Sequence, residues 1–433
     1  MSADEFNHKL LRSSLGALGV RQLAKRTSDS VIHRITGETA RPSAPASTYS
    51  SGDGETRSGQ RIGKRGDDSM SDATVRFFPV GNGDCTLLWV GETRVLIDLS
   101  PRIQSGDPHY DVEEMRDELL PLLKRDDGRY VVDAFLITHP DRDHVLEAEE
   151  LLHLGAPDDY NTDDERIFVE EIIYVPASLE AQADDLSSDA KAVLKEIERR
   201  LDEDSSAGNL VSALIGPKGE DPGADRVFSA GDMIETFGAS TSDERLAGVV
   251  YAPRGVLDPQ DRNDVSGVVQ FSITPTGSVD PVRIIMGGDA PYEVWEDIYD
   301  NESLDDFKYD LMLAPHHCSW SVFGESSDDD PSEKVIELFK NCHSEAKIVS
   351  SSFAIDSDRT PPNEKAAGIY REIVGEDDFY CTGEYPSEDE HIPIVFEISD
   401  SGVQESGGKK RSKGGGGAAA LIRRTPQRYG TET

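Results

Sequence analysis

Residues 131–144 read Val-Val-Asp-Ala-Phe-Leu-Ile-Thr-His-Pro-Asp-Arg-Asp-His, and this stretch decides the fold. Its first half, Val131 to Thr138, is a short apolar run, which predicts a buried strand. The strand is expected to end at His139-Pro140, because proline has no amide hydrogen with which to continue a β-ladder. The turn that follows offers two imidazoles and two carboxylates: His139, Asp141, Asp143 and His144.

This concentration of lone-pair donors on one turn predicts a metal site. Imidazoles and carboxylates on a tight turn can converge on one ion without a long loop being ordered. The alternative is a polar turn in which Asp143 caps the next helix. That alternative would be preferred for a lone His or Asp, but four potential ligands directly after a buried strand favour the metal site.

The motif resembles a known family. His139-x-Asp141-x-Asp143-His144 resembles the HxHxDH signature of the metallo-β-lactamase superfamily, with Asp in place of the second His. This variant is similar to the hydrolase domain of the bacterial DNA-uptake channel ComEC and its soluble relatives. Further segments resemble that subgroup in the same order, and they are Val80-Gly-Asn-Gly-Asp84 with Val95-Leu-Ile-Asp98, Asn263-Asp-Val-Ser266, Gly287-Gly-Asp289 and Ala314-Pro-His-His317. The resemblance covers roughly Thr74 to Ser399.

The resemblance implies an α/β fold, a four-layer αβ/βα sandwich with the site at one edge. It also implies a ligand set. His139 and Asp141 would bind a first ion, Asp143 and His144 a second, and Asp289 would bridge both. Of the two adjacent imidazoles, the spacing from Pro315 favours His317 as a ligand and His316 as a substrate contact.

One expected ligand is missing from the sequence. The superfamily usually has a further ligand His before the Gly-Asp motif, but the only His between His144 and Asp289 is His153, on a predicted helix. The first ion would then rely on water or on an extra ligand such as Asp264. More oxygen ligands shift the preference from zinc toward manganese. The identity of the metal and its number, one or two ions, stay open.

Supporting residues are expected around these ligands. Asp98 is expected to orient a ligand from behind, and Asp84 to fix its turn through backbone hydrogen bonds. Asn263, Asp264 and Ser266 are expected behind the ligands or in contact with the substrate.

The predicted activity is metal-dependent hydrolysis. A bound ion lowers the pKa of its water, so that hydroxide forms at neutral pH. Asp143 would orient that water and accept its proton, and His316 would stabilise the developing charge or protonate the leaving group. Resemblance to the nuclease-like subgroup favours phosphodiesters, with nucleic acid first and a small phosphodiester second. Two alternatives stay open, a hydrolase of esters, lactones or amides and a non-catalytic module that binds a metal or nucleotide.

The charge distribution bears on the substrate. The formal net charge of the 433-residue chain is -40, and residues 71–400 hold 26 basic and 74 acidic residues, a charge of -48. Such a surface repels polyanions unless salt screens it or a local basic patch exists. A high-salt cytoplasm and a general gain in solubility are equally good explanations of the acidity.

The cysteines and the hydropathy indicate the compartment. The four cysteines lie far apart and form no CxxC pair, which argues against a thiolate zinc site and a disulfide scaffold. No stretch approaches the roughly 20 apolar residues of a membrane span, and no signal sequence is evident. We therefore expect a cytoplasmic protein that cannot itself form a channel. The sequence does not identify any protein partner.

Three regions are expected along the chain. Residues 1–69 are predicted to be disordered, or not to be translated at all, since Met70 directly precedes the first convincing strand. Residues 70–400 would form the hydrolase domain, with a possible insertion near 179–247 whose part from Asp202 to Ala247 looks rich in loops. Residues 401–433 are predicted to be a flexible, basic, glycine-rich tail. Within the domain, the apolar patterns predict strands and helices that alternate through both halves, including one helix over residues 145–153 and another over 179–201.

Overall fold

A computed structural model describes residues 72–101, 112–180, 185–216, 221–239, 242–254, 261–355, 361–387 and 390–406. The predictions for residues 1–69 and for the tail beyond residue 406 therefore lie outside the described residues.

Most described strands belong to two sheets. The first sheet contains, in spatial order, β18 (Gly402–Glu405), β17 (Ile394–Ser399), β1 (Ala73–Phe77), β2 (Thr86–Val90), β3 (Thr93–Ile97), β4 (Val131–Leu136), β5 (Phe168–Tyr174), β6 (Leu210–Ile215) and β7 (Arg226–Ser229). The second contains β14 (Phe379–Cys381), β13 (Cys342–Ser350), β12 (Tyr309–Leu313), β11 (Val282–Met286), β10 (Val268–Ile273), β9 (Leu246–Ala252) and β8 (Met233–Ile234). A small hairpin joins β15 (Pro386–Ser387) to β16 (Glu390–His391).

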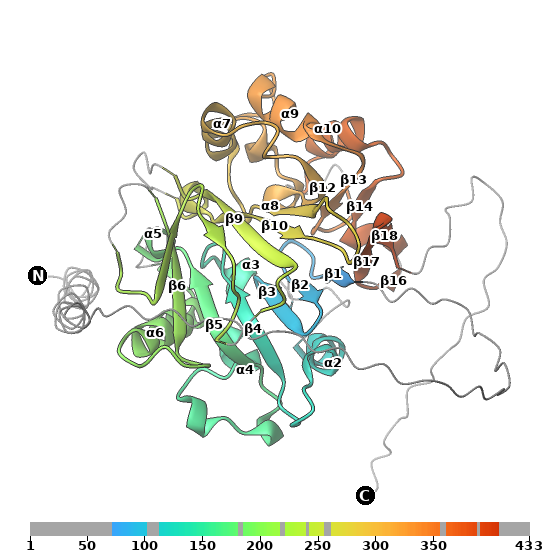
Figure 1. Ribbon diagram of the computed structural model, residues 1–433. Coiled ribbons are helices and arrows are strands. Elements are labelled where there is room, and N and C mark those ends of the chain that lie inside the picture. Colours follow the sequence, from blue (N-terminus) through green and yellow to red (C-terminus); the bar gives the residue numbers. More distant parts are fainter. Residues whose placement is uncertain are drawn as a thin grey trace, which may run out of the picture.

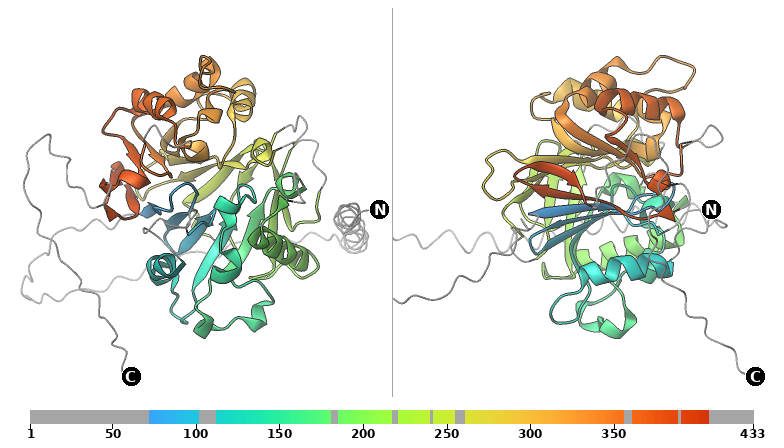
Figure 2. Two further views of the ribbon diagram at one scale, coloured as in Figure 1. Left: turned by 180° about the vertical axis from the view of Figure 1, so that it is seen from behind. Right: turned by 90° about the vertical axis from the view of Figure 1, so that its right-hand side faces the viewer.

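Helices cover the outer face of each sheet (Figures 1 and 2). On the side of the first sheet lie α2 (Val112–Leu123), α3 (Arg142–Val145), α4 (Ala148–Leu151), α5 (Pro176–Glu180) and α6 (Ser188–Leu201). On the side of the second lie α7 (Tyr292–Asn301), α9 (Glu333–Lys340) and α10 (Glu364–Val374). The right-hand view of Figure 2 shows the order helix, sheet, sheet, helix. The predicted α/β class and four-layer sandwich are thus confirmed.

Three apolar cores separate these four layers. One lies between the first sheet and its helices and includes Leu119 and Ile197. The central core lies between the sheets and includes Ile97, Leu136 and Ile284. The third core packs residues such as Trp295, Phe339 and Tyr370 against the second sheet. Since β4 is buried along its whole length, its apolar run is the pattern typical of a strand covered on both faces.

The sheet topology places the motif-bearing strand ends at one edge. Strands β3 to β7 are parallel, as are β11 to β14. Asp98 follows β3, His139 follows β4, Asp289 follows β11, and His316 follows β12. In each parallel group the side chains after the strands therefore emerge at the same end.

Two predictions about the chain organisation were incomplete. The stretch from Asp202 to Ala247 contains β6, β7 and β8, and most of β6 is buried, because Leu210 to Ile215 is an apolar run that extends the parallel sheet. The domain also continues past residue 400, since β18 pairs with β17 after a turn at Gly402, whose φ is 92°.

The helix predictions were correct in place but too continuous. The helix predicted over residues 145–153 is divided into α3 and α4, because Glu147 has a left-handed φ of 58°. The helix predicted over 179–201 is α5 followed by α6, and α6 starts where Ser187 accepts a hydrogen bond from Ala190 N.

Two further expectations concerned the cysteines and the possibility of a membrane span. All four cysteines are free thiols. Cys318 is buried and packs in the third core. None of the described helices has both the length and the apolarity that a membrane span requires.

Candidate metal centre

The motif turn is fixed by backbone hydrogen bonds to the opening strands. His144 N donates to Asp141 O at 3.0 Å, and Leu99 N donates to His144 O at 2.8 Å. Asp84 N donates to Asp143 O at 3.1 Å. As a result His139 and His144 are fully buried at the end of β4. Asp143 is not a helix cap, so the alternative of a polar capping turn is wrong: the cap position of α3 is Asp141, and its side chain makes no capping bond.

A buried carboxylate orients the imidazole of His144 from behind. Asp98 Oδ2 lies 2.8 Å from His144 Nδ1, and the same carboxylate accepts hydrogen bonds from Thr138 N and Thr138 Oγ1 at 2.8 and 2.7 Å. Burial raises the pKa of Asp98, while the charge of His144 and their hydrogen bond oppose that rise. With Nδ1 held in this way, Nε2 of His144 is directed to the opposite side.

The Gly-Asp motif brings a second carboxylate against that imidazole. Gly288 has a φ of 49°, and a Cβ at this position would lie 2.6 Å from Thr138 Oγ1. Only glycine fits both the backbone angle and the space. The turn places Asp289 Oδ1 3.1 Å from His144 Nε2, and Asp289 Oδ2 3.9 Å from His139 Nε2.

The His-His motif comes from the second sheet and is held in an unusual backbone conformation. His316, His317 and Cys318 have φ values of 49°, 51° and 64°. Residues other than glycine rarely adopt this backbone region, and such conformations cluster at functional sites. Backbone hydrogen bonds hold this segment in place, since His316 N donates to Gly288 O at 3.0 Å and Asn363 N donates to Cys318 O at 2.9 Å.

The two imidazoles of this motif differ in their surroundings. His317 is buried, with Nδ1 3.1 Å from Ser351 O and 3.5 Å from Asp84 Oδ1. Its Nε2 lies 3.4 Å from Asp143 Oδ2 and 3.5 Å from Asp289 Oδ1. His316 keeps 22% of its side chain exposed, with Nε2 3.5 Å from Asp289 Oδ2 and Nδ1 2.9 Å from Ser321 Oγ.

Four of the predicted ligands form a compact group. One ligand atom each from Asp143, His144, Asp289 and His317 lies within 4.8 Å of the others. His144 Nε2, His317 Nε2 and Asp289 Oδ1 are buried, yet none makes a hydrogen bond within the described part of the chain. Buried polar atoms without partners are costly. Nitrogen and oxygen donors at these separations fit one divalent cation, which would satisfy all three atoms.

The ionisation of the group also fits a cation. Burial opposes charge on both imidazoles, but Asp289 and the neighbouring carboxylates raise the pKa values of His144 and His317 well above the usual value. Burial likewise opposes charge on the carboxylates, but the imidazoles hold the pKa values of Asp143 and Asp289 below their usual range. In the metal-free protein, protons on His144 and His317 therefore supply the positive charge that a metal would supply.

The remaining predicted residues lie in three different settings. Asp141 is hydrogen-bonded to Arg262 Nε, and its Oδ2 is 3.7 Å from His139 Nε2. Asp264 is exposed. It belongs neither to this group nor to the second potential ligand group among the described residues, which consists of Asp84, Asp98 and His144, so its expected role as an extra ligand is not supported. Asn263 begins η5 (Asn263–Val265) and Ser266 directly follows it, and their buried Oδ1 and Oγ atoms have no hydrogen-bond partner within the described residues.

Sequence reasoning missed several residues that contact the predicted site residues. They are Thr138 beside Asp98, Ser321 on His316, Ser351 behind His317, and Arg262 on Asp141. The sequence did offer a clue to Arg262, since it is a basic residue directly before the Asn-x-x-Ser segment in a strongly acidic domain. The sequence offered no such clue to Thr138, Ser321 or Ser351, because Ser and Thr are common in turns.

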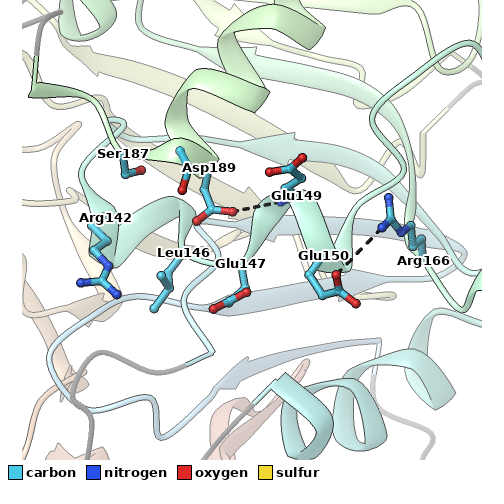
Figure 3. Close-up of a pocket in the computed structure, with 9 residues that line it drawn as sticks. Arg142, Leu146, Glu147, Glu149, Glu150, Arg166, Ser187 and Asp189 are labelled. Atoms are coloured by element: carbon cyan, nitrogen blue, oxygen red, sulfur yellow. Dashed lines mark hydrogen bonds and ion pairs between the residues drawn. The ribbon is translucent and has the colours of Figure 1, made fainter.

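Neither His153 nor Arg142 belongs to the group. His153 Nε2 is 2.9 Å from Ala156 O, and its ring packs against Tyr160 and Phe168. Arg142 lines a separate hollow between α3, α4 and the start of α6 (Figure 3). Glu149 N there donates to Asp189 Oδ1 at 3.2 Å, and Arg166 pairs with Glu150. No residue of the metal group lines this hollow.

Comparisons with known proteins give matches among solved structures alone. No protein-family model matches the chain, and no curated protein matches it. The metallo-β-lactamase fold protein YhfI from Bacillus subtilis is 8% identical, with a TM-score of 0.33, and the match covers 75% of this chain and 99% of that one. Igni18, a metallo hydrolase from Ignicoccus hospitalis KIN4/I, is 11% identical with a TM-score of 0.36, covering 75% and 100%. A diphosphatase from the PhnP family is 10% identical with a TM-score of 0.34, covering 74% and 97%.

Proposed function

We propose that this protein is a metal-dependent hydrolase of the metallo-β-lactamase superfamily, of the ComEC-like type, and that it cleaves phosphodiesters. One observation carries the proposal. Buried ligand atoms of His144, Asp289 and His317, which make no hydrogen bond within the described residues and come from three distant segments, converge within 4.8 Å together with a carboxylate oxygen of Asp143. A divalent ion bound by these four residues would lower the pKa of a water and stabilise negative charge on a substrate oxygen.

The residues around the ligands have distinct proposed tasks. Asp98 holds His144 through its Nδ1, while Asp84 and the carbonyl of Ser351 face Nδ1 of His317. These contacts fix the two rings so that their Nε2 atoms face the carboxylates. The oxygen of Asp143 that faces His317 is also suited to accept a proton from a nucleophilic water.

His316 is proposed to act on the substrate rather than on the ion. Its imidazole is partly exposed beside Asp289, and Ser321 Oγ holds its Nδ1. An exposed ring in that position can donate a hydrogen bond to an anionic oxygen or a proton to a leaving group. This favours a catalytic protein over a module that only binds a metal.

An activity assay tests the proposal. Purified protein with manganese or zinc should hydrolyse bis-p-nitrophenyl phosphate, and His144→Ala and Asp289→Asn should abolish turnover together with metal binding. His316→Ala should bind metal normally but lose about 10²-fold in kcat. His343→Ala is the matched control, because His343 is a partly exposed imidazole near Asp310 and outside the group.

The substrate panel separates the alternatives. Turnover of a lactone or carboxylic ester without turnover of bis-p-nitrophenyl phosphate would contradict the phosphodiesterase. Stoichiometric metal binding without turnover of either class, or of single-stranded DNA, would instead indicate a binding module.

A further inference from the structure

The two halves of the candidate metal centre are unequal. Around the second predicted ion position, Asp289 Oδ1 lies 3.1 Å from His144 Nε2 and 3.5 Å from His317 Nε2. Around the first, Nε2 of His139 lies 3.7 Å from Asp141 and 3.9 Å from Asp289. The four-residue group includes neither His139 nor Asp141, and the other potential ligand group among the described residues also lacks both. The first position is therefore the less complete of the two.

A guanidinium is paired with the carboxylate that a second ion would need. Arg262 Nε donates a hydrogen bond to Asp141 Oδ1, and 11% of the Arg262 side chain and 25% of the Asp141 side chain are exposed. Arginine keeps its positive charge at any pH the protein experiences. A carboxylate already paired with arginine gives up less electron density to a metal, so this pair makes Asp141 a weaker ligand.

The fold itself brings Arg262 to the motif. Arg262 directly precedes η5, and Val265 N donates to its carbonyl at 3.2 Å. Two residues after η5, Gly267 N donates to Thr138 O at 2.9 Å, which ties this segment to the residue before His139. The pair between Arg262 and Asp141 thus joins two anchored backbone segments.

We propose that the centre holds a single divalent ion, bound by Asp143, His144, Asp289 and His317, and that Arg262 replaces a second ion. This inference rests on the proposed function, because it assumes that the group binds a metal. Arg262 neutralises Asp141 and keeps it from completing the first position. The protein then presents one metal ion and one fixed guanidinium in place of two ions.

Counting bound metal tests this inference without any activity measurement. Protein is loaded with zinc or with manganese, dialysed, and analysed by mass spectrometry of the metal and by amino-acid quantification. The wild type should retain about one ion per chain. Asp141→Asn should also retain about one, since Asp141 is not a ligand of the retained ion. Arg262→Ala should gain a second, weaker ion, because Asp141 becomes free to bind it.

Further variants make each outcome decisive. Arg262→Lys keeps a positive charge at this position and should stay at about one ion. Arg226→Ala removes a partly buried arginine that pairs with Glu171, remote from the metal group in sequence, and should also stay at about one. Two ions in the wild type, with one lost in Asp141→Asn, would overturn the inference, and so would an Arg262→Ala variant that stays at one. A wild type that binds no ion would contradict the proposed function itself.

Discussion

At the scale of single residues, the candidate centre depends on groups that would not touch a bound ion. Asp98 lies 2.8 Å from His144 Nδ1 and also accepts both hydrogen bonds offered by Thr138. A carboxylate in that position fixes the tautomer and the orientation of the ring and makes it a better ligand.

Asp98→Asn should therefore weaken metal binding about 10–100-fold. An asparagine can still accept from Thr138, but its amide no longer stabilises a proton on His144 Nδ1. Competition against a chelating dye measures the affinity. Asp133→Asn is the control, since Asp133 is a buried carboxylate on the neighbouring strand β4 that bonds Arg94 N and Arg125. It should lower the melting temperature and leave the affinity unchanged, and an equal affinity loss in both variants would contradict the proposed role.

The raised pKa values of His144 and His317 predict how the loss of stability on metal removal depends on pH. A histidine whose folded pKa is raised stabilises the folded state below its unfolded pKa and loses that contribution as pH rises through the folded pKa. The metal-free protein should therefore lose stability on the alkaline side, where its imidazoles give up their protons. The metal replaces those protons, so its stabilising effect should grow with pH.

Thermal unfolding with and without a chelator measures this effect. The drop in melting temperature caused by the chelator should be larger at about pH 8 than at about pH 6. A drop that shrinks as pH rises would show that the metal does not displace protons from these imidazoles.

At the scale of elements, four strand ends deliver the candidate ligands and the carboxylate behind them, and tight turns set their directions. The turn after β11 needs Gly288, because its φ is 49° and the side chain of Thr138 occupies the space of a Cβ. The turn after β12 carries three consecutive non-glycine residues with positive φ. Regular strands thus supply the scaffold, and irregular turns aim the side chains.

Gly288→Ala should damage both stability and metal binding. The backbone angle alone costs about 1–2 kcal/mol, and the contact with Thr138 should add about 1–3 kcal/mol. Gly128→Ala provides the comparison, because Gly128 also has a positive φ, of 89°, but no atom lies within 4 Å of the position that its Cβ would occupy. Chemical denaturation should show the larger loss for Gly288→Ala, and that variant alone should bind metal more weakly. Equal effects in the two variants would argue against a packed turn beneath Asp289.

At the scale of the whole molecule, charge opposes one of the proposed substrates. Residues 71–400 carry a formal charge of -48, so a long nucleic acid approaches a repulsive surface. A small phosphodiester carries little charge and is affected much less.

Raising the salt from about 0.05 M to about 0.5 M should therefore increase kcat/KM for single-stranded DNA, because screening weakens the repulsion. The value for bis-p-nitrophenyl phosphate should change by no more than about twofold. Proteins that bind nucleic acid through basic patches show the opposite trend, a steep loss with salt. A steep loss here would reveal a basic patch that the net charge conceals.

The sequence predicted the four layers and the candidate ligand segments because its local motifs resemble those of a known family. The apolar run at 131–138 and the glycines before Asp289 are readable in a single line of sequence. β6 was missed because its short apolar run follows a long charged helix and is surrounded by loop-forming residues. The pair between Arg262 and Asp141 joins residues 121 positions apart, and no local pattern predicts such a contact.

Anomalous diffraction from crystals of the metal-loaded protein tests the central claim most directly. The account predicts a peak at the metal absorption edge about 2.0–2.3 Å from His144 Nε2, His317 Nε2 and carboxylate oxygens of Asp143 and Asp289. A peak elsewhere, such as among the acidic residues around Glu149, or no peak between these four side chains, would contradict it.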